Sequence, residues 1–198
     1  MEKFKIFDLY EMEGIVVNDI GLKNVINLNP KLMLKSHGRN VQKFGQAKVN
    51  IVERLINRLS VAGHRGKKHR IILGHTTGKF SKNAKKVIDA FNIIQGKTGK
   101  NPVEVLIKAI ENSSPRDEIT TIEYGGARYP QAVDVAPLRR VSLAIKHIIH
   151  GACDKAFGKK KKIEQALADE IMLASDGNQE SFAVRKKIEA EKQADSAR

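Results

Sequence analysis

Apolar residues recur at helical spacing in one segment of this chain after another, and this repetition limits the fold more than any other feature. In the first segment, Val52, Leu55, Ile56 and Leu59 stand three or four positions apart, so they line one face of a helix that ends before Gly63. A helix with one apolar face buries it against another element. The pattern therefore predicts a helical domain.

Four more segments carry such an apolar stripe, with start or stop signals beside them, and a further helix is expected near the end of the chain. The clearest begins with Asn101 as N-cap and Pro102 as the first helical residue, and Ser113-Ser114-Pro115 ends it. We expect a mainly α protein with a single domain of about six helices. One of the other four helices follows the N-cap Ser81 and stops before Gly96, and another begins at Pro137. The last two run from Ile163 to a close at Gly177 and from Gln179 to Gln193.

The period of the pattern changes between the third and fourth of these helices. Residues 119–124 and 127–135 are typical of strands, and Gly125-Gly126 between them allows the positive φ angles of a type I′ turn. Pro130 has no backbone N–H to donate, and two strands alone are marginally stable in water. The predicted β-hairpin over 119–135 therefore needs a partner or is an arm that reaches for one.

The first 44 residues differ from the rest because they lack sustained periodicity. They contain several glycines and the turn signal Asn29-Pro30, so we interpret 1–44 as an irregular N-terminal arm with a short strand near Ile15 to Val17. The helical domain then occupies 45–198. No run of about 18 apolar residues predicts a membrane span, and the first residues lack the pattern of a signal peptide, so a cytoplasmic protein is expected.

Charge separates this chain from an ordinary soluble domain. Its 36 Lys and Arg residues exceed its 22 Asp and Glu residues, and the net charge of +14 is more than solubility requires. From Arg54 to Ile88 there is no acidic residue. A polyanionic partner explains this segment better than a solvated charged loop, which would mix both signs. Its predicted RNA-contact residues are Arg54, Arg58, Arg65, Lys67, Lys68, Arg70, Lys79, Lys82, Lys85 and Lys86.

Further candidates lie in the arm, in the hairpin and beside later helices. Aromatic residues make up only 5% of the chain and Trp is absent, which disfavours base stacking and favours backbone and shape recognition of folded RNA. Tyr129 is an exception that contacts RNA or packs across the hairpin, and the lysines of 159–162 contact RNA or form a solvated link. These candidates are Lys35, Arg39, Lys43, Lys48, Arg116, Arg128, Tyr129, Arg139, Arg140, Lys159 and Lys160, with Gly125 and Gly126 at the hairpin tip.

Patterns that would indicate catalysis fail in this sequence. Gly96-Lys97-Thr98 looks like the end of a P-loop, but Phe91 stands where a glycine is needed. His147, His150 and Cys153 lie on one helical face, yet a zinc site needs a fourth ligand, so helix packing or RNA-facing imidazoles are favoured. We expect no catalytic residue, metal or cofactor. A helix-turn-helix DNA-binding regulator and an RNA-modifying enzyme remain as alternative hypotheses.

Four sequence blocks carry a family resemblance. They are NIVERLIN at 50–57, TGKNPVEVLIKAIENSSPRDE at 98–118, YGGARYPQAVDVAPLRR at 124–140 and ALADEIMLAS at 166–175. These blocks resemble the universal small-subunit ribosomal protein seven family, whose eukaryotic member is called small-subunit protein five. The blocks follow the family's order, and the resemblance covers nearly everything from Asn29 to Arg198. Details such as IEYGGARY look more archaeal than bacterial.

This resemblance implies a structural protein of the small ribosomal subunit and not an enzyme. It implies a helical domain that binds the 3′ major domain of the small-subunit rRNA, nucleates assembly of the subunit head and contacts neighbouring ribosomal proteins. It also implies that the hairpin around Gly125 to Tyr129 lies near the exit-site tRNA and the mRNA exit path. The arm, the first basic helix and Arg139-Arg140 match positions where the family meets RNA.

Overall fold

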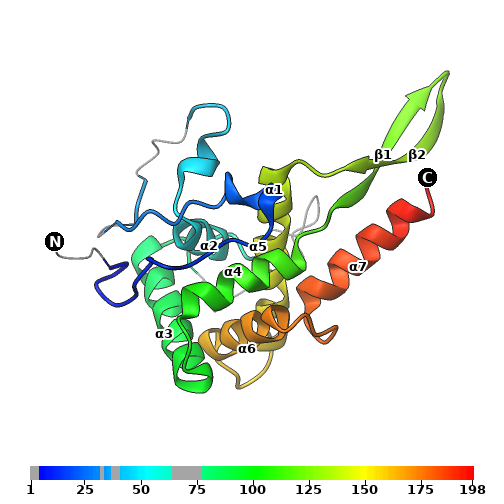
Figure 1. Cartoon of the computed structure of the whole chain (residues 1–198). Helices are drawn as coiled ribbons and strands as arrows, with labels where there is room; N and C mark the ends of the chain where they lie inside the picture. The colour runs from blue at the N-terminus through cyan, green and yellow to red at the C-terminus, as the bar shows by residue number, and fades with distance from the viewer. Residues whose placement is uncertain (1–4, 32–33, 37–40, 64–76) are drawn as a thin grey trace.

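The computed structural model describes residues 5–31, 34–36, 41–63 and 77–198. Within them the chain is mainly helical and carries one antiparallel hairpin that projects from the helices (Figure 1), which confirms the predicted fold class. No helix in these ranges is long and apolar enough to cross a membrane. The elements are α1 (Ile20–Lys23), the 3-10 turn η1 (Gly45–Lys48), α2 (Ile51–Leu59), α3 (Phe80–Thr98), α4 (Pro102–Ser113), β1 (Asp117–Tyr124), β2 (Ala127–Asp134), α5 (Pro137–Ala156), α6 (Ile163–Ser175) and α7 (Phe182–Asp195).

The six helices expected from periodicity are α2 to α7, but three of their predicted ends are wrong. Helix α3 begins at Phe80 after Lys79, so Ser81 lies inside the helix and is not its N-cap. Helix α7 begins after Ser181, whose side chain accepts from the Val184 N–H, and not at Gln179.

Asn101 caps α4 by accepting a hydrogen bond from the Val103 N–H at 3.0 Å, and Pro102 opens the helix. Helix α3 does not stop before Gly96 but continues to Thr98. It ends where Gly99 adopts a φ of +66°, because a glycine in this left-handed conformation terminates a helix.

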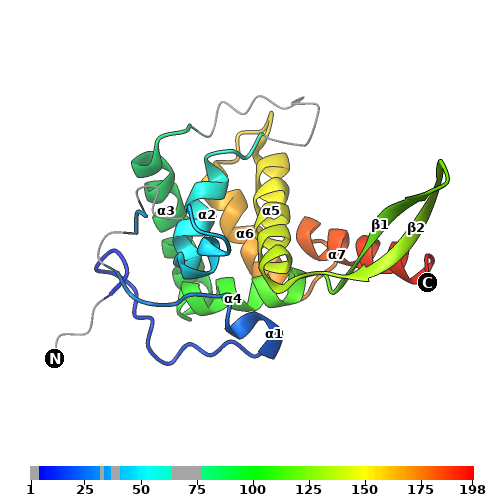
Figure 2. The ribbon, with the colours of Figure 1, turned by 90° about the horizontal axis from the view of Figure 1, so that it is seen from above.

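Helix α6 forms the centre of the helical domain. It packs against α3, α4 and α5, and Figure 2 shows it between α2 and α5. Its buried face includes Ala166, Ala168 and Ala174, each fully buried. Small side chains let neighbouring helices approach closely, and the larger Leu167 and Ile171 fill the remaining space in the core.

The N-terminal arm contributes more to the core than its sequence indicates. Tyr10 is buried, packs edge-on against Phe91 at 5.8 Å between ring centroids, and donates a hydrogen bond to Asn92 Oδ1 at 2.5 Å. Ile6, Met12, Leu22, Ile26 and Leu34 are also buried in the main cluster. The division into an arm and a domain at residue 44 stays a prediction.

The short strand predicted near Ile15 to Val17 is wrong. These residues belong to no strand in the structure. The following backbone N–H groups of Asn18 and Asp19 instead donate to the Glu111 carboxylate on α4, at 2.6 and 3.1 Å. A side chain 93 and 92 positions away in the sequence therefore satisfies these two backbone donors.

The hairpin has the turn that its glycine pair predicts. Gly125 and Gly126 have φ values of +59° and +81°, and the ladder runs from the Tyr124–Ala127 pair to the Asp117–Asp134 pair. Its outer part is exposed, whereas α7 packs along its base (Figure 1). The hairpin is therefore an arm fixed at one end.

A buried carboxylate holds α7 in this place. Glu170 on α6 is fully buried, and its Oε1 accepts hydrogen bonds from the Ser181 hydroxyl at 2.8 Å and the Ala183 N–H at 3.2 Å. Its Oε2 accepts from Lys155 Nζ on α5 at 2.6 Å. Gly151 makes this arrangement fit, because a Cβ there would lie 2.7 Å from the Phe182 Cβ and 2.8 Å from the Glu170 carboxyl carbon.

Gly151→Ala is therefore expected to lower the free energy of unfolding by about 2 kcal/mol, because the added methyl group overpacks a closed contact. Gly96→Ala is the matched control, since a Cβ at that exposed helical position meets nothing within 4 Å. The control should raise stability by up to about 1 kcal/mol through helix propensity. Urea unfolding of both variants tests this, and equal stability of the two would contradict the proposed close contact.

Candidate nucleic-acid interface

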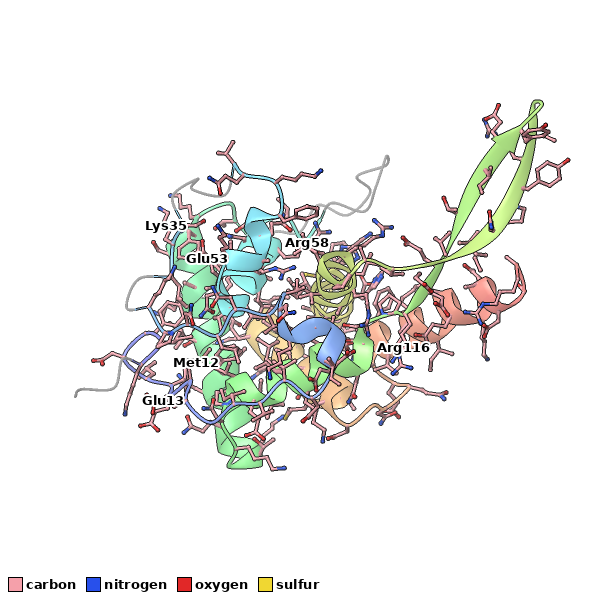
Figure 3. The ribbon with its side chains drawn as sticks, turned by 45° about the horizontal axis from the view of Figure 1, so that its top comes forward. Met12, Glu13, Lys35, Glu53, Arg58 and Arg116 are labelled. Atoms are coloured by element: carbon pink, nitrogen blue, oxygen red, sulfur yellow. The ribbon has the colours of Figure 1, made fainter. Side chains whose placement is uncertain are left out.

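A cleft of about 440 Å³ between α2 and α5 brings together several cations and no carboxylate. Its charged lining comes from Arg54 and Arg58 on α2 and from Arg139 and Lys146 on α5. Figure 3 labels Arg58 where these two helices face each other. The remaining lining residues are Gln46, Val49, Asn57, Val61, Ser142, Leu143 and Ile145.

Helical spacing in the sequence builds this cleft. Arg54 and Arg58 lie four positions apart beside the buried stripe of α2, and Arg139, Ser142 and Lys146 follow at i, i+3 and i+7 on α5. Each helix therefore presents a polar stripe next to its apolar one. Where the two stripes meet, cations from distant parts of the sequence face a common space.

Arg54 is the most firmly held cation of the cleft. Only 8% of its surface is exposed, and its guanidinium donates to Ser142 Oγ at 3.1 Å and to the Val25 carbonyl at 3.3 Å. Burial lowers the pKa of Arg54 to about 10, so the side chain stays protonated at neutral pH. It is a fixed positive charge at the floor of the cleft, with little rotamer freedom left to lose when a ligand binds.

The adjacent residues Arg139 and Arg140 have different surroundings, because successive helical residues point in different directions. Arg139 is exposed at the cleft rim and forms two hydrogen bonds to the Glu118 carboxylate, at 2.6 and 2.7 Å. These hydrogen bonds raise the pKa of Arg139. Arg140 is buried, bonds Asp19 at 2.8 Å and the Pro115 carbonyl at 3.1 Å, and fastens the arm to the hairpin base.

Two histidines of α5 lie near Arg58 but do not line the cleft. Arg58 Nη2 lies 3.4 Å from Nε2 of the buried His150. The rings of His150 and His147 pack edge-on, with 6.3 Å between their centroids. Burial, followed by the nearby cations Lys146, Lys186 and Arg58, lowers the pKa of His147 to about 4. The centroid of the His147 ring also lies 6.2 Å from that of the Phe182 ring. The two imidazoles therefore take part in helix packing beside the cleft.

A second basic surface lies at one end of the helical domain. Lys86 on α3 and Lys159 to Lys162 before α6 line a hollow of about 420 Å³, together with Ile163 and Glu164 at the start of α6. Lys161 and Lys97 bond Asp169 at 2.5 and 2.9 Å, and these hydrogen bonds lower the pKa of Asp169 although burial opposes them. The hollow thus brings predicted RNA-contact residues of α3 and of the loop before α6 together. The exposed lysines 79, 82 and 85 lie at the same end of α3.

The other predicted RNA-contact residues are more dispersed. Lys35 lies over the Phe80 ring and Lys43 over the Phe44 ring, at 5.8 and 5.5 Å from the centroids. Lys48 and Arg116 are exposed, and Arg128 on the hairpin is 3.5 Å from Glu123. Tyr129 is 58% exposed. Arg39, Arg65, Lys67, Lys68 and Arg70 lie outside the described residues.

The cleft also contains Lys146 and Asn57, which clusters of basic residues in the sequence do not predict. Lys146 stands alone in an apolar stretch, so a search for clusters of basic residues misses it. The available signal was its position seven residues after Arg139, two helical turns along the same face. Asn57 likewise lies between Arg54 and Arg58 on the exposed side of α2.

The low pKa of His147 predicts a loss of stability in acid. The unfolded chain binds a proton at this residue below the ordinary pKa of 6.5, whereas the folded chain does so only near 4. The free energy of unfolding should therefore fall by up to about 3 kcal/mol between these pH values. His147→Gln should lose less stability over this range in urea titrations at pH 7 and pH 4.5. An identical pH dependence of variant and parent would contradict the assignment.

Comparisons of the sequence with known proteins identify its family. The sequence model of the family described as Ribosomal protein S7p/S5e matches residues 26–198. A relative from Nanoarchaeum equitans is 49% identical over 197 residues, which is 99% of this chain and all of the relative. Relatives from Methanosphaera stadtmanae and Methanothermobacter thermautotrophicus are each 45% identical, over 98% and 97% of this chain and 98% of each relative.

All three relatives are named small ribosomal subunit protein uS7 and come from archaea, in agreement with the archaeal character of the sequence. The family match covers all of α2 to α7 and the hairpin. The chain belongs to the Ribosomal protein S7p/S5e family.

Proposed function

We propose that this chain is a structural protein of the small ribosomal subunit, not an enzyme, and that it binds the 3′ major domain of the small-subunit rRNA. The observation that carries this proposal is the α2–α5 cleft, in which four cations meet without a carboxylate in the lining. Membership of a ribosomal protein family supports the assignment to the small subunit. Under this proposal the protein is located in the cytoplasm, within the small ribosomal subunit.

The mechanism is binding energy without bond chemistry. Arg54 is held in place before RNA arrives, whereas Arg58, Arg139 and Lys146 have solvent-facing surface that phosphate oxygens can reach. Each phosphate that meets such a cation releases counterions, which drives association at moderate salt. The lysine-lined hollow near Lys86 lies on other elements than the cleft and supports contact with a second RNA segment. Holding two segments together would nucleate folding of the subunit head.

The hairpin serves a different partner under this proposal. Its one cation in 119–132, Arg128, is paired with Glu123, so its outer part offers little net charge to phosphates. It does offer Tyr124 and Tyr129, which are 82% and 58% exposed. These tyrosines suit contacts to unpaired bases, in keeping with a position near the exit-site tRNA and the mRNA exit path. Neighbouring ribosomal proteins of the head would cover other faces.

Replacing two cleft cations tests the RNA interface. The double variant Arg58→Gln and Lys146→Gln should bind a transcript of the 3′ major domain more weakly and lower the salt slope of log K by about two, since two phosphate contacts are lost. Lys100→Gln with Lys108→Gln is the matched control, because both lysines are exposed and lie outside the cleft.

Filter binding across a salt series, with an unrelated structured RNA of equal length, gives the readout. Binding to the 3′ major domain should persist at salt where the unrelated RNA has dissociated. Equal losses in the cleft variant and the control variant would remove the cleft from the interface. Equal affinity of the parent protein for both RNAs would reduce the function to nonspecific polyanion binding and revive the DNA-binding regulator hypothesis.

A further inference from the structure

Arg139 contacts both the cationic cleft and the hairpin. It lines the cationic cleft between α2 and α5, and both of its hydrogen bonds to Glu118, at 2.6 and 2.7 Å, go to the first strand of the hairpin. Its side chain is 57% exposed and that of Glu118 is 26% exposed. The ion pair is therefore accessible to water and to any anion that enters the cleft.

Other contacts hold the hairpin base, but they lie away from the cleft. The Val135 N–H donates to the Arg116 carbonyl at 2.8 Å, the Arg116 N–H donates to Glu191 on α7 at 3.0 Å, and Arg198 bonds Asp117 at 2.8 Å. Among the described residues with these base contacts, Arg139 is the one that also lines the cleft. A change in the cleft can therefore reach the hairpin through this side chain.

We propose that Glu118 and an RNA phosphate compete for the Arg139 guanidinium, so that RNA entering the cleft breaks the side-chain contact between the first strand of the hairpin and α5. This inference rests on the proposed RNA binding in the cleft. It goes beyond it by coupling that site to the position of the hairpin. Glu118 is thereby a positioning residue that limits RNA affinity in the free protein.

The chemistry of the two acceptors makes the exchange feasible. Carboxylate and phosphate both accept the paired N–H groups of a guanidinium, so the two compete for the same donors. Arg54, Arg58 and Lys146 attract the phosphate but lie on the cleft side, whereas the Glu118 charge repels it. The coupling is reciprocal. RNA binding weakens the contact between Arg139 and Glu118, and this contact weakens RNA binding by the same free energy.

A double-mutant cycle with the 3′ major domain transcript separates this competition from general electrostatics. Glu118→Gln should bind the transcript about three- to tenfold more tightly than the parent at low salt, since the competing charge is gone. The gain should largely vanish in an Arg139→Gln background. Glu123→Gln is the matched control, because it removes the same charge from the same strand near the hairpin tip and should leave affinity unchanged.

Hydrogen exchange of the full chain gives a second readout. Backbone amides of Glu118 and Ile119 should exchange faster when the transcript is bound, and the free Glu118→Gln variant should already exchange at the faster rate. A gain of equal size in both backgrounds, no gain at all, or unchanged or slower exchange on RNA binding would overturn the proposal.

The same measurements separate this inference from the proposed function. If the Arg58 and Lys146 variant loses affinity while Glu118→Gln binds like the parent, only the competition for Arg139 is wrong. If neither set of variants alters binding, the cleft is not the RNA interface and both proposals fail.

Discussion

The buried carboxylate of Glu170 is the interaction on which the arrangement of the C-terminal half depends. It binds the Ser181 hydroxyl and a backbone N–H in the first turn of α7, and it accepts a charge-assisted hydrogen bond from Lys155 on α5. A charge with no exposure is stable only when it is paired and hydrogen-bonded, so the three helices are held in one relative position. Helix α7 then carries Glu191 and the last residues to the hairpin base, and the hairpin in turn holds Arg139 at the cleft. The position of Arg139 at the cleft thus depends on the buried Glu170.

Arg140 plays the corresponding part for the N-terminal arm. Its guanidinium joins Asp19 before α1 to the Pro115 carbonyl before β1, across 121 sequence positions in the first case. Arg139 beside it joins the hairpin to the cleft. Two neighbouring residues of one helix therefore tie three separate segments together, one through a buried contact and the other through an exposed one.

The sequence predicts most of the secondary structure because local signals determine it. The helical period marks α2 to α7, and the glycine pair marks the hairpin turn. The errors arise where distant residues decide. The donors of Asn18 and Asp19 are satisfied by Glu111, which no local pattern reveals, and the burial of Tyr10 depends on Phe91. For the interface, clusters of basic residues identify Arg54, Arg58 and Arg139, whereas Lys146 requires the helical face to be considered. The burial of Arg140 and the need for a glycine at 151 follow only from the packing.

The cations of the cleft have a consequence for the free protein. Four like charges gathered between two helices repel one another, and the Glu118 carboxylate, which is paired with Arg139, offsets only part of that repulsion. Added salt should therefore stabilise the free protein, whereas it would weaken the complex with RNA that we propose, so that the two states respond to ionic strength in opposite directions. Under that proposal, RNA phosphates supply the counter-charge that the lining of the cleft lacks.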